Sequence, residues 1–461
     1  MEKYVDLYKL VTDFKFDLNE LVFSLIFAKS VCSSEKTQTF HDLLPCLYKE
    51  YNYSRDQMLD GLTYIGKSYE RFIEMFLVRV KRVYGIDTDK TYFYSSNFYF
   101  EIDKATDFSC KVPSPNSRKD IFVGMSILFD ESQIPIAMKL YPKNESEKPV
   151  LKEVMDQMKK YSRTTKRTIH VACKGLNYAK SITYAMENGN GYIFSRTLEG
   201  LPDKEEAWVL SDSGFKSVKD NNDNILYLYK SCIDELSYTT EYDNRSIKVH
   251  ITEKRLLTFN PALAKKKREE IKIMVDRIKF LTLSKAKWEE YGDVAKYVSY
   301  RDRTGNQTIL SLNQEAIDRD LRFAGYNLLV TSETQMNDHD IYDTYHNLSS
   351  IEESFKIMKF DLDKSPIFLQ NENSINGHFL ICFFAVMLER IFQAKILENK
   401  FIQAEIIDFS KSVKVLKTGN QYINISTKSK IIDELSLMFS LPLNSYYLSE
   451  AQVSQIFAKK K

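Results

Sequence analysis

The order of strand-like and helix-like segments between residues 92 and 195 is the feature that most restricts the fold of this chain. Residues 92–102 are dense in aromatic and β-favouring side chains and predict a strand, as does the run 121–129. The polar residues 130–133 predict a turn into a third strand at 134–141. Helix, strand, helix and strand patterns then follow at 147–161, 168–172, 175–186 and 192–195. An antiparallel meander followed by crossover helices and parallel strands predicts an α/β protein.

This order is that of an RNase H-like fold, so we expect an RNase H-like mixed sheet as the core. The strand pattern resumes at 326–331, and a long helix is predicted at 338–360. The expected regions are an N-terminal helical region with possible DNA binding (1–85), the first part of the core (86–200), a β-rich insertion with a long charged helix (201–325), the second part of the core (326–400) and a mixed tail (401–461). The insertion interrupts the core just before the long helix.

Charge and cysteine usage narrow the classes of function. The formal net charge is only +2, but residues 159–180 and 264–268 are basic runs that could meet phosphate groups locally. The six cysteines form no CxxC pair, so neither a zinc site nor a disulfide framework is indicated. The first residues are charged, and the longest apolar run, 379–388, is too short to span a bilayer. We expect a cytoplasmic protein without a membrane partner.

Residues 341–390 carry the most specific pattern in the chain. The segment IYDTYHNLSSIEESFKIMKFDLDK resembles the last signature block of the bacterial insertion-sequence DDE transposases of family four, in which one helix bears Tyr, Arg, Glu and Lys. Tyr345, Glu352 and Lys359 match this pattern, whereas Leu348 stands at the arginine position. The blocks TYFYSSNFYFEID, VACKGLN and NGNGYIF also resemble the family, and the resemblance runs in order over about residues 40–460.

The spacing of the charged residues in this block suits a DNA-processing site. Glu352, Lys356 and Lys359 fall at i, i+4 and i+7, so a helix would present them on one face. The resemblance implies that Glu352 binds a metal ion and that Tyr345 and Lys359 contact DNA. Lys356, beside them, would also reach a DNA phosphate. An exposed amphipathic helix with an ion pair is the plain alternative for such a segment taken alone.

Two positions depart from the family at its catalytic, metal-binding residues. Aligned on the matching residues, the first two catalytic aspartates of the family fall on Tyr94 and Cys173. DDE chemistry uses two Mg²⁺ or Mn²⁺ ions at the scissile phosphate, and these hard cations require anionic oxygen ligands. The acids near Tyr94 are all an odd number of residues away, so a regular strand turns them to the other face unless a bulge intervenes.

Three functional hypotheses remain open. The resemblance implies DNA transposition. The protein would act as a homo-oligomer bound to the double-stranded DNA ends of a mobile element. The first hypothesis is an inactive or impaired transposase, or a DNA-binding derivative of one. The second is an active transposase with a non-standard metal site, and the third is a non-catalytic protein that uses the scaffold to bind a protein partner. A Tyr94 nucleophile is disfavoured because the six histidines are dispersed, and His170, His346 and His378 are expected to be core or surface residues.

Overall fold

A mixed sheet forms the centre of the molecule in the computed structural model. The described residues are 16–31, 51, 53–86, 91–100, 110–113, 119–142, 156, 159–160, 167–172, 182, 185–186, 189–220, 223–242, 245–283, 296–303, 306–346, 372–419 and 421–457. The first six strands are β1 (Thr91–Phe100), β2 (Cys110–Pro113), β3 (Lys119–Phe129), β4 (Pro135–Pro142), β5 (Thr168–Ala172) and β6 (Gly191–Arg196).

The strand order confirms the expected core. The strands β4, β3 and β1 are neighbours and antiparallel, and β5 and β6 continue the sheet beyond β1 in parallel. A first strand in the middle, with a meander on one side and parallel strands on the other, is the arrangement of an RNase H-like fold. The short strand β2 is an addition that pairs with the start of β3. The predicted turn between β3 and β4 is present, and the Asp130 carboxylate accepts a hydrogen bond from the Ile134 amide at 2.7 Å within it.

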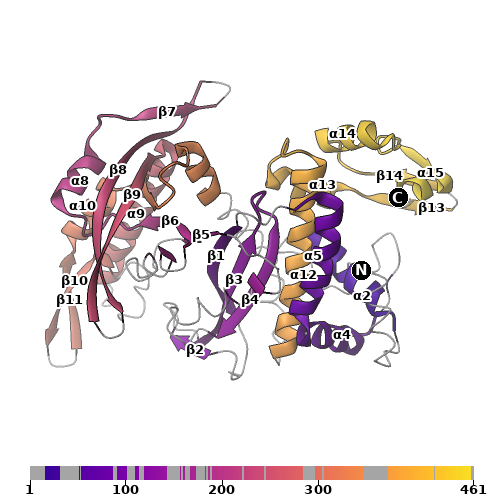
Figure 1. Cartoon of the computed structure of the whole chain (residues 1–461), viewed down its shortest axis with the longest axis horizontal. Helices are drawn as coiled ribbons and strands as arrows, with labels where there is room; N and C mark the ends of the chain where they lie inside the picture. Colours follow the sequence, from indigo (N-terminus) through magenta and orange to yellow (C-terminus); the bar gives the residue numbers. More distant parts are fainter. Residues whose placement is uncertain are drawn as a thin grey trace.

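Three strands of the insertion, β7, β8 and β9, extend the core sheet, whereas β10 and β11 pair as a separate two-stranded sheet. Strand β12 (Tyr326–Thr331) lies between β6 and β9 and is antiparallel to both, and the sheet continues through β8 to β7. Figure 1 shows these elements at one end of the molecule. The insertion comprises α8 (Asp203–Leu210), β7 (Lys216–Lys219), β8 (Ile225–Tyr242), β9 (Arg245–Phe259), α9 (Pro261–Leu283), β10 (Val298–Arg303), β11 (Asn306–Leu312) and α10 (Gln314–Arg322).

A helical segment at residues 338–346, here called the lead helix, follows β12. Its start agrees with the predicted helix at 338. Asn337 caps it, because its side-chain oxygen accepts a hydrogen bond from the Asp340 amide at 2.8 Å. The rest of the predicted helix lies outside the described residues.

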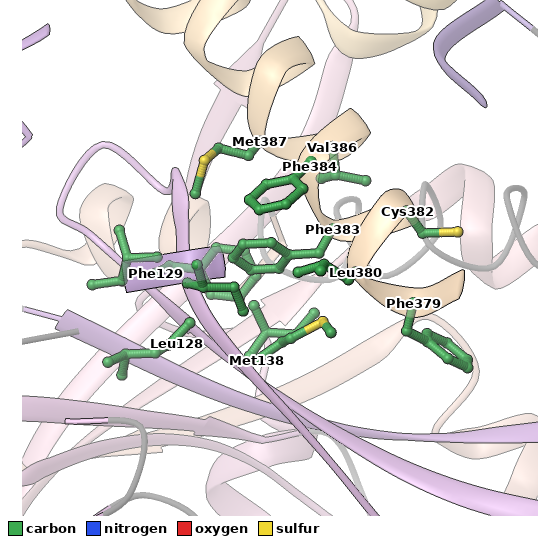
Figure 2. Packing of buried hydrophobic residues seen from close by; sticks show 14 of the residues in the cluster. Leu128, Phe129, Met138, Phe379, Leu380, Cys382, Phe383, Phe384, Val386 and Met387 are labelled. Atoms are coloured by element: carbon green, nitrogen blue, oxygen red, sulfur yellow. The ribbon is translucent and has the colours of Figure 1, made fainter. Parts of the chain in front are cut away.

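Four helices build a bundle on the meander side of the sheet, at the opposite end of Figure 1 from the insertion. They are α2 (Leu18–Val31), α4 (Arg55–Lys67), α5 (Tyr69–Tyr84) and α12 (Glu372–Ile391). Helix α12 packs on β4 and is buried on nearly all sides, which explains its long apolar run. Figure 2 shows Leu380 and Phe383 pointing from α12 toward Phe129 and Met138 of the sheet. No described helix is long and apolar enough to cross a membrane.

Two glycines allow α4 and α12 to cross closely. A Cβ atom on Gly66 would collide with the carbonyl oxygen of Asn373, and one on Gly377 with that of Leu62. The backbones of the two helices therefore touch at this crossing, and larger residues would push them apart. The N-terminal helices accordingly share the hydrophobic cluster of the sheet.

The C-terminal residues form a small module after α12 and the π-helical turn η5 (Phe392–Ile396). A three-stranded sheet in the order β13-β14-β15 lies beside three helices. These elements are α13 (Gln403–Ser412), β13 (Val415–Thr418), β14 (Gln421–Asn424), α14 (Lys430–Phe439), β15 (Tyr447–Ser449) and α15 (Glu450–Phe457). The sequence predicted these residues only as a mixed tail.

Candidate active site

Strands β1 and β5 lie side by side, and their register fixes the backbone surroundings of position 94. Tyr94 pairs with Val171 of β5 and with Ile127 of β3. Cys173 directly follows Ala172, the last residue of β5, and lies outside the described residues. One position at which the resemblance expects an aspartate is therefore in a central strand. The other directly follows the neighbouring strand in the sequence.

Position 94 belongs to the side of the sheet that the lead helix covers. Paired residues of neighbouring strands share a side of the sheet, so position 94 shares its side with Val171, which pairs in turn with Ile193 of β6. Val171 and Ile193 are buried in one hydrophobic cluster with Ile341 and Tyr345 of the lead helix. This common cluster brings the first part of the signature block to the side on which the missing acid would lie.

Tyr345 is the one predicted site residue whose side chain is described. It is only 8% exposed, and its ring meets that of His346 edge to face at 5.3 Å between centroids. The remaining predicted site residues of the block, Glu352, Lys356 and Lys359, lie outside the described residues, and their approach to position 94 stays a prediction.

Tyr345 and His346 line a cavity of about 690 Å³ between the lead helix and the insertion. Aromatic side chains from three other places in the chain contribute to its wall, namely Tyr297, Phe323 and Tyr326. This cavity could not be predicted from the sequence, because its residues come from segments far apart in the chain and show no common spacing.

The charges around this cavity are balanced by ion pairs. Lys267 binds Glu270 at 2.9 Å and Arg319 binds Glu199 at 3.0 Å. Lys296 binds Asp320 at 2.7 Å. Burial acts to raise the pKa of Asp320, but hydrogen bonds from Lys296 and from the Tyr297 hydroxyl outweigh it, so the pKa lies below its ordinary value. These carboxylates are already held by cations and are poor candidates for metal ligands.

The donor set expected at the DDE positions does not fit a pair of divalent ions. A tyrosine phenol and a cysteine thiol replace two carboxylates, and only Glu352 supplies the anionic oxygen that Mg²⁺ prefers. Among the described residues, no three His, Cys, Asp or Glu side chains are grouped so that they could hold a metal ion. Asp130 is the carboxylate at the end of β3, but it is engaged in the β3–β4 turn, three residues beyond the partner of Tyr94.

The histidines near the core behave as the sequence analysis expected. His170 lies opposite Phe93 in the β1–β5 pair, with its ring centroid 5.5 Å away. Burial, aided by the charge of Lys159, lowers the pKa of His170 to about 3. Burial also lowers the pKa of His346 and of His378, to which Lys29 adds its charge. These rings are neutral near pH 7; His170 and His378 are buried in the core, whereas His346 is half-buried beside the cavity.

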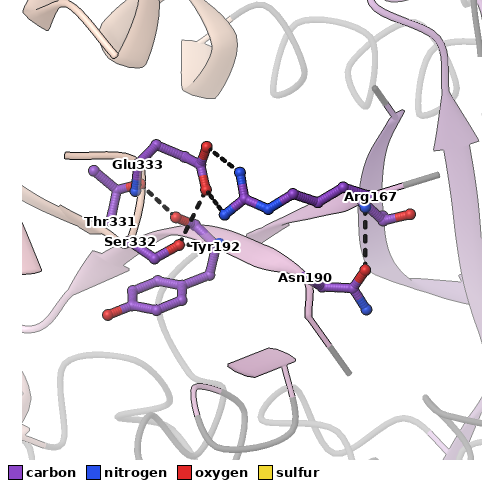
Figure 3. A network of polar contacts seen from close by, with 7 residues as sticks. Arg167, Asn190, Tyr192, Thr331, Ser332 and Glu333 are labelled. Carbon is purple, nitrogen blue, oxygen red and sulfur yellow. Dashed lines mark hydrogen bonds and ion pairs between the residues drawn. The ribbon is translucent and has the colours of Figure 1, made fainter. Parts of the chain in front are cut away.

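A polar clamp ties the first part of the core to the strand that follows the insertion (Figure 3). Arg167, just before β5, donates two hydrogen bonds to Glu333, just after β12, at 2.7 and 2.6 Å. The Ser332 hydroxyl donates to the same carboxylate and accepts from the Tyr192 amide. A Cβ atom on Gly191 would meet the Glu333 carboxylate, so a larger residue here would displace this side chain from the clamp. The clamp aligns β12, and hence the start of the lead helix, with β5 and β6.

A buried ionic network fixes the insertion to the core on the other side of the sheet. Glu253 of β9 is fully buried and accepts a hydrogen bond from the Tyr192 hydroxyl at 2.9 Å. Arg255 approaches both Glu253 and Glu205 of α8, at 3.7 and 3.2 Å. Buried charges of this kind are tolerated only when they are paired, so the network holds β9 and α8 in one arrangement.

Comparisons with known proteins leave the family open. No family model and no curated protein sequence matches the chain. Among solved structures, the chain is similar to the piggyBac transposase in a synaptic complex with hairpin DNA, at 10% identity and a TM-score of 0.34. That match covers 87% of this chain and 71% of the other. A likeness this distant assigns no family, and the RNase H-like arrangement follows from the strand order and register described above.

Proposed function

We propose that this chain is a transposase-like protein that binds double-stranded DNA. Its metal-dependent strand-cleavage centre is catalytically inactive. The observation that carries the proposal is the β1–β5 register within an RNase H-like sheet. It puts Tyr94 at a central position, on the side covered by the lead helix. A phosphoryl-transfer centre on this scaffold would need carboxylates at this position and at 173.

The chemistry of the replacements supports an inactive centre. A tyrosine phenol is neutral near pH 7 and a cysteine offers a soft sulfur donor, so neither replaces an aspartate toward Mg²⁺. The sequence keeps Glu352 and the lysines that follow it. The protein therefore keeps groups that could hold DNA but lacks two of the three carboxylates that would bind the catalytic metal ions. Assembly as a homo-oligomer on mobile-element ends belongs to the same proposal.

Restoring the acids tests this function. The purified chain is expected to nick no supercoiled DNA in Mg²⁺ or Mn²⁺, because one carboxylate cannot hold the metal pair. The double variant Tyr94→Asp, Cys173→Asp is expected to nick DNA detectably, and addition of Glu352→Ala should abolish that gain. Tyr94→Asn with Cys173→Asn is a matched control, since amides of the same size at the same positions supply no anionic oxygen for Mg²⁺. Wild-type nicking that disappears with Glu352→Ala would overturn the inactive centre.

A protein-binding role is the second candidate, and the C-terminal module favours it. Leu416 and Tyr447 flank Ile423 on one side of the three-stranded sheet and are 54% and 60% exposed. Exposed apolar rows of this kind often mark protein interfaces. DNA binding should weaken steeply with salt, whereas a chain that binds no DNA, or binds it without salt dependence, would support this second role.

A further inference from the structure

Helix α9 carries an excess of positive charge. It has seven basic and three acidic residues, a net charge of +4, whereas the whole chain carries +2. A polyanion is attracted where cations gather on the surface, and α9 is one such place among the described residues.

Three of these cations form a row along one flank of α9. Lys265, Arg268 and Lys272 follow the i, i+3, i+7 spacing, which places them within about 60° around a helix of 3.6 residues per turn. All three are exposed. We call Lys265, Arg268 and Lys272 the cationic row.

The packing of α9 leaves the cationic row open. The helix buries a narrow stripe made by Ala264, Ile271 and Ile278, which recur every seven residues. Its neighbouring cation Lys267 points to the cavity and is paired with Glu270. Among the described residues, no carboxylate lies within ion-pair distance of any member of the row. The row is therefore neither neutralised nor covered within the described part of the chain.

We infer that the cationic row binds the phosphate backbone of double-stranded DNA, an inference that rests on the DNA-binding function proposed above. Seven residues of α-helix span about 10.5 Å. One strand of duplex DNA presents a phosphate about every 3.4 Å of axis, so the row matches about three phosphate steps. Arginine and lysine on a rigid helix would position the duplex without reading its sequence. The insertion then supplies a DNA contact at a distance from the predicted site.

The salt dependence of DNA binding tests this inference. The affinity of the full chain for a labelled duplex of random sequence is measured by fluorescence anisotropy between 50 and 200 mM NaCl. The triple variant Lys265→Gln, Arg268→Gln, Lys272→Gln should bind more weakly, and the slope of log K against log salt should shrink by about 2.7, or about 0.9 per phosphate contact. Its melting temperature should not fall, because glutamine is a good helix former and all three positions are exposed. Each single variant should shrink the slope by about 0.9, which provides a test if the triple variant does not fold.

A matched control separates the row from general electrostatics. Lys414→Gln, Lys417→Gln, Lys428→Gln removes the same charge from exposed positions of the C-terminal module and should leave the slope unchanged. An unchanged slope in the row variant, or an equal loss in the control, overturns the inference while the proposed function stands. Tighter row-dependent binding to duplex RNA than to duplex DNA overturns the choice of DNA. Wild-type protein that binds no duplex at any salt concentration overturns the proposed function and, with it, this inference.

Discussion

Glu389 shows how one residue can report on the contact between the core and the C-terminal module. It lies near the end of α12, is 7% exposed, and its Oε2 atom has no hydrogen-bond partner among the described residues. Burial raises the pKa of Glu389 to about 8, although the charge of Lys411 on α13 acts in the opposite direction. The folded protein therefore holds this carboxyl in its neutral form at pH 7, whereas the unfolded chain ionises it.

This difference predicts a pH dependence of stability. A carboxyl whose pKa is higher in the folded state contributes fully below its unfolded pKa, and the contribution is lost as pH rises toward 8. The free energy of unfolding of the wild type should therefore fall between pH 5 and pH 8 relative to Glu389→Gln, by at least about 1 kcal/mol, the value of one pKa unit. Urea unfolding at each pH measures it, with Glu372→Gln, an exposed glutamate of the same helix, as control. A constant difference between wild type and Glu389→Gln across this range would contradict the prediction.

At the scale of elements, the sequence predicted the strands whose apolar residues form short, dense runs. It missed the full length of strands in which charged residues interrupt the apolar pattern. The meander, β5, β6 and β12 were predicted because their hydrophobic runs are short, dense and bounded by turns. For the region of β8 and β9 the sequence predicted a β-rich insertion but not strands of this length, which extend over Ile225–Tyr242 and Arg245–Phe259. Asp234, Glu253 and Arg255 interrupt the apolar pattern there, but they pair with one another, so the strands continue.

The crossing of α4 and α12 depends on close backbone contact that no periodicity reveals. Replacing Gly377 with alanine puts a methyl group against the carbonyl of Leu62, which cannot move without displacing α4. The expected loss in unfolding free energy is about 1–3 kcal/mol, the usual cost of overpacking. Gly61→Ala is the matched control in α4, because its methyl group meets side-chain atoms of Leu21 and Leu18 and no backbone atom of another helix. Thermal unfolding of both variants measures the effect, and a Gly377→Ala variant as stable as the wild type would show that the helices do not touch here.

At the scale of the whole molecule, strand order could be predicted but the meeting of distant segments could not. The order of elements indicated the RNase H-like core and located Tyr94 within its first strand. The cavity beside Tyr345 and the clamp between Arg167 and Glu333 join residues more than a hundred positions apart, and sequence spacing holds no information about such contacts. The assignment of Glu352, Lys356, Lys359 and Cys173 to one site stays a prediction from the resemblance.

A calorimetric titration with Mn²⁺ tests most directly whether Tyr94, Cys173 and Glu352 lack the oxygen ligands for two divalent ions. Wild type and Glu352→Ala should give the same titration, without a pair of specific sites, because a phenol and a thiol do not supply the missing carboxylates. The variant Tyr94→Asp, Cys173→Asp should gain Mn²⁺ binding that depends on Glu352. Two ions bound per wild-type chain, both lost on Glu352→Ala, would contradict the account.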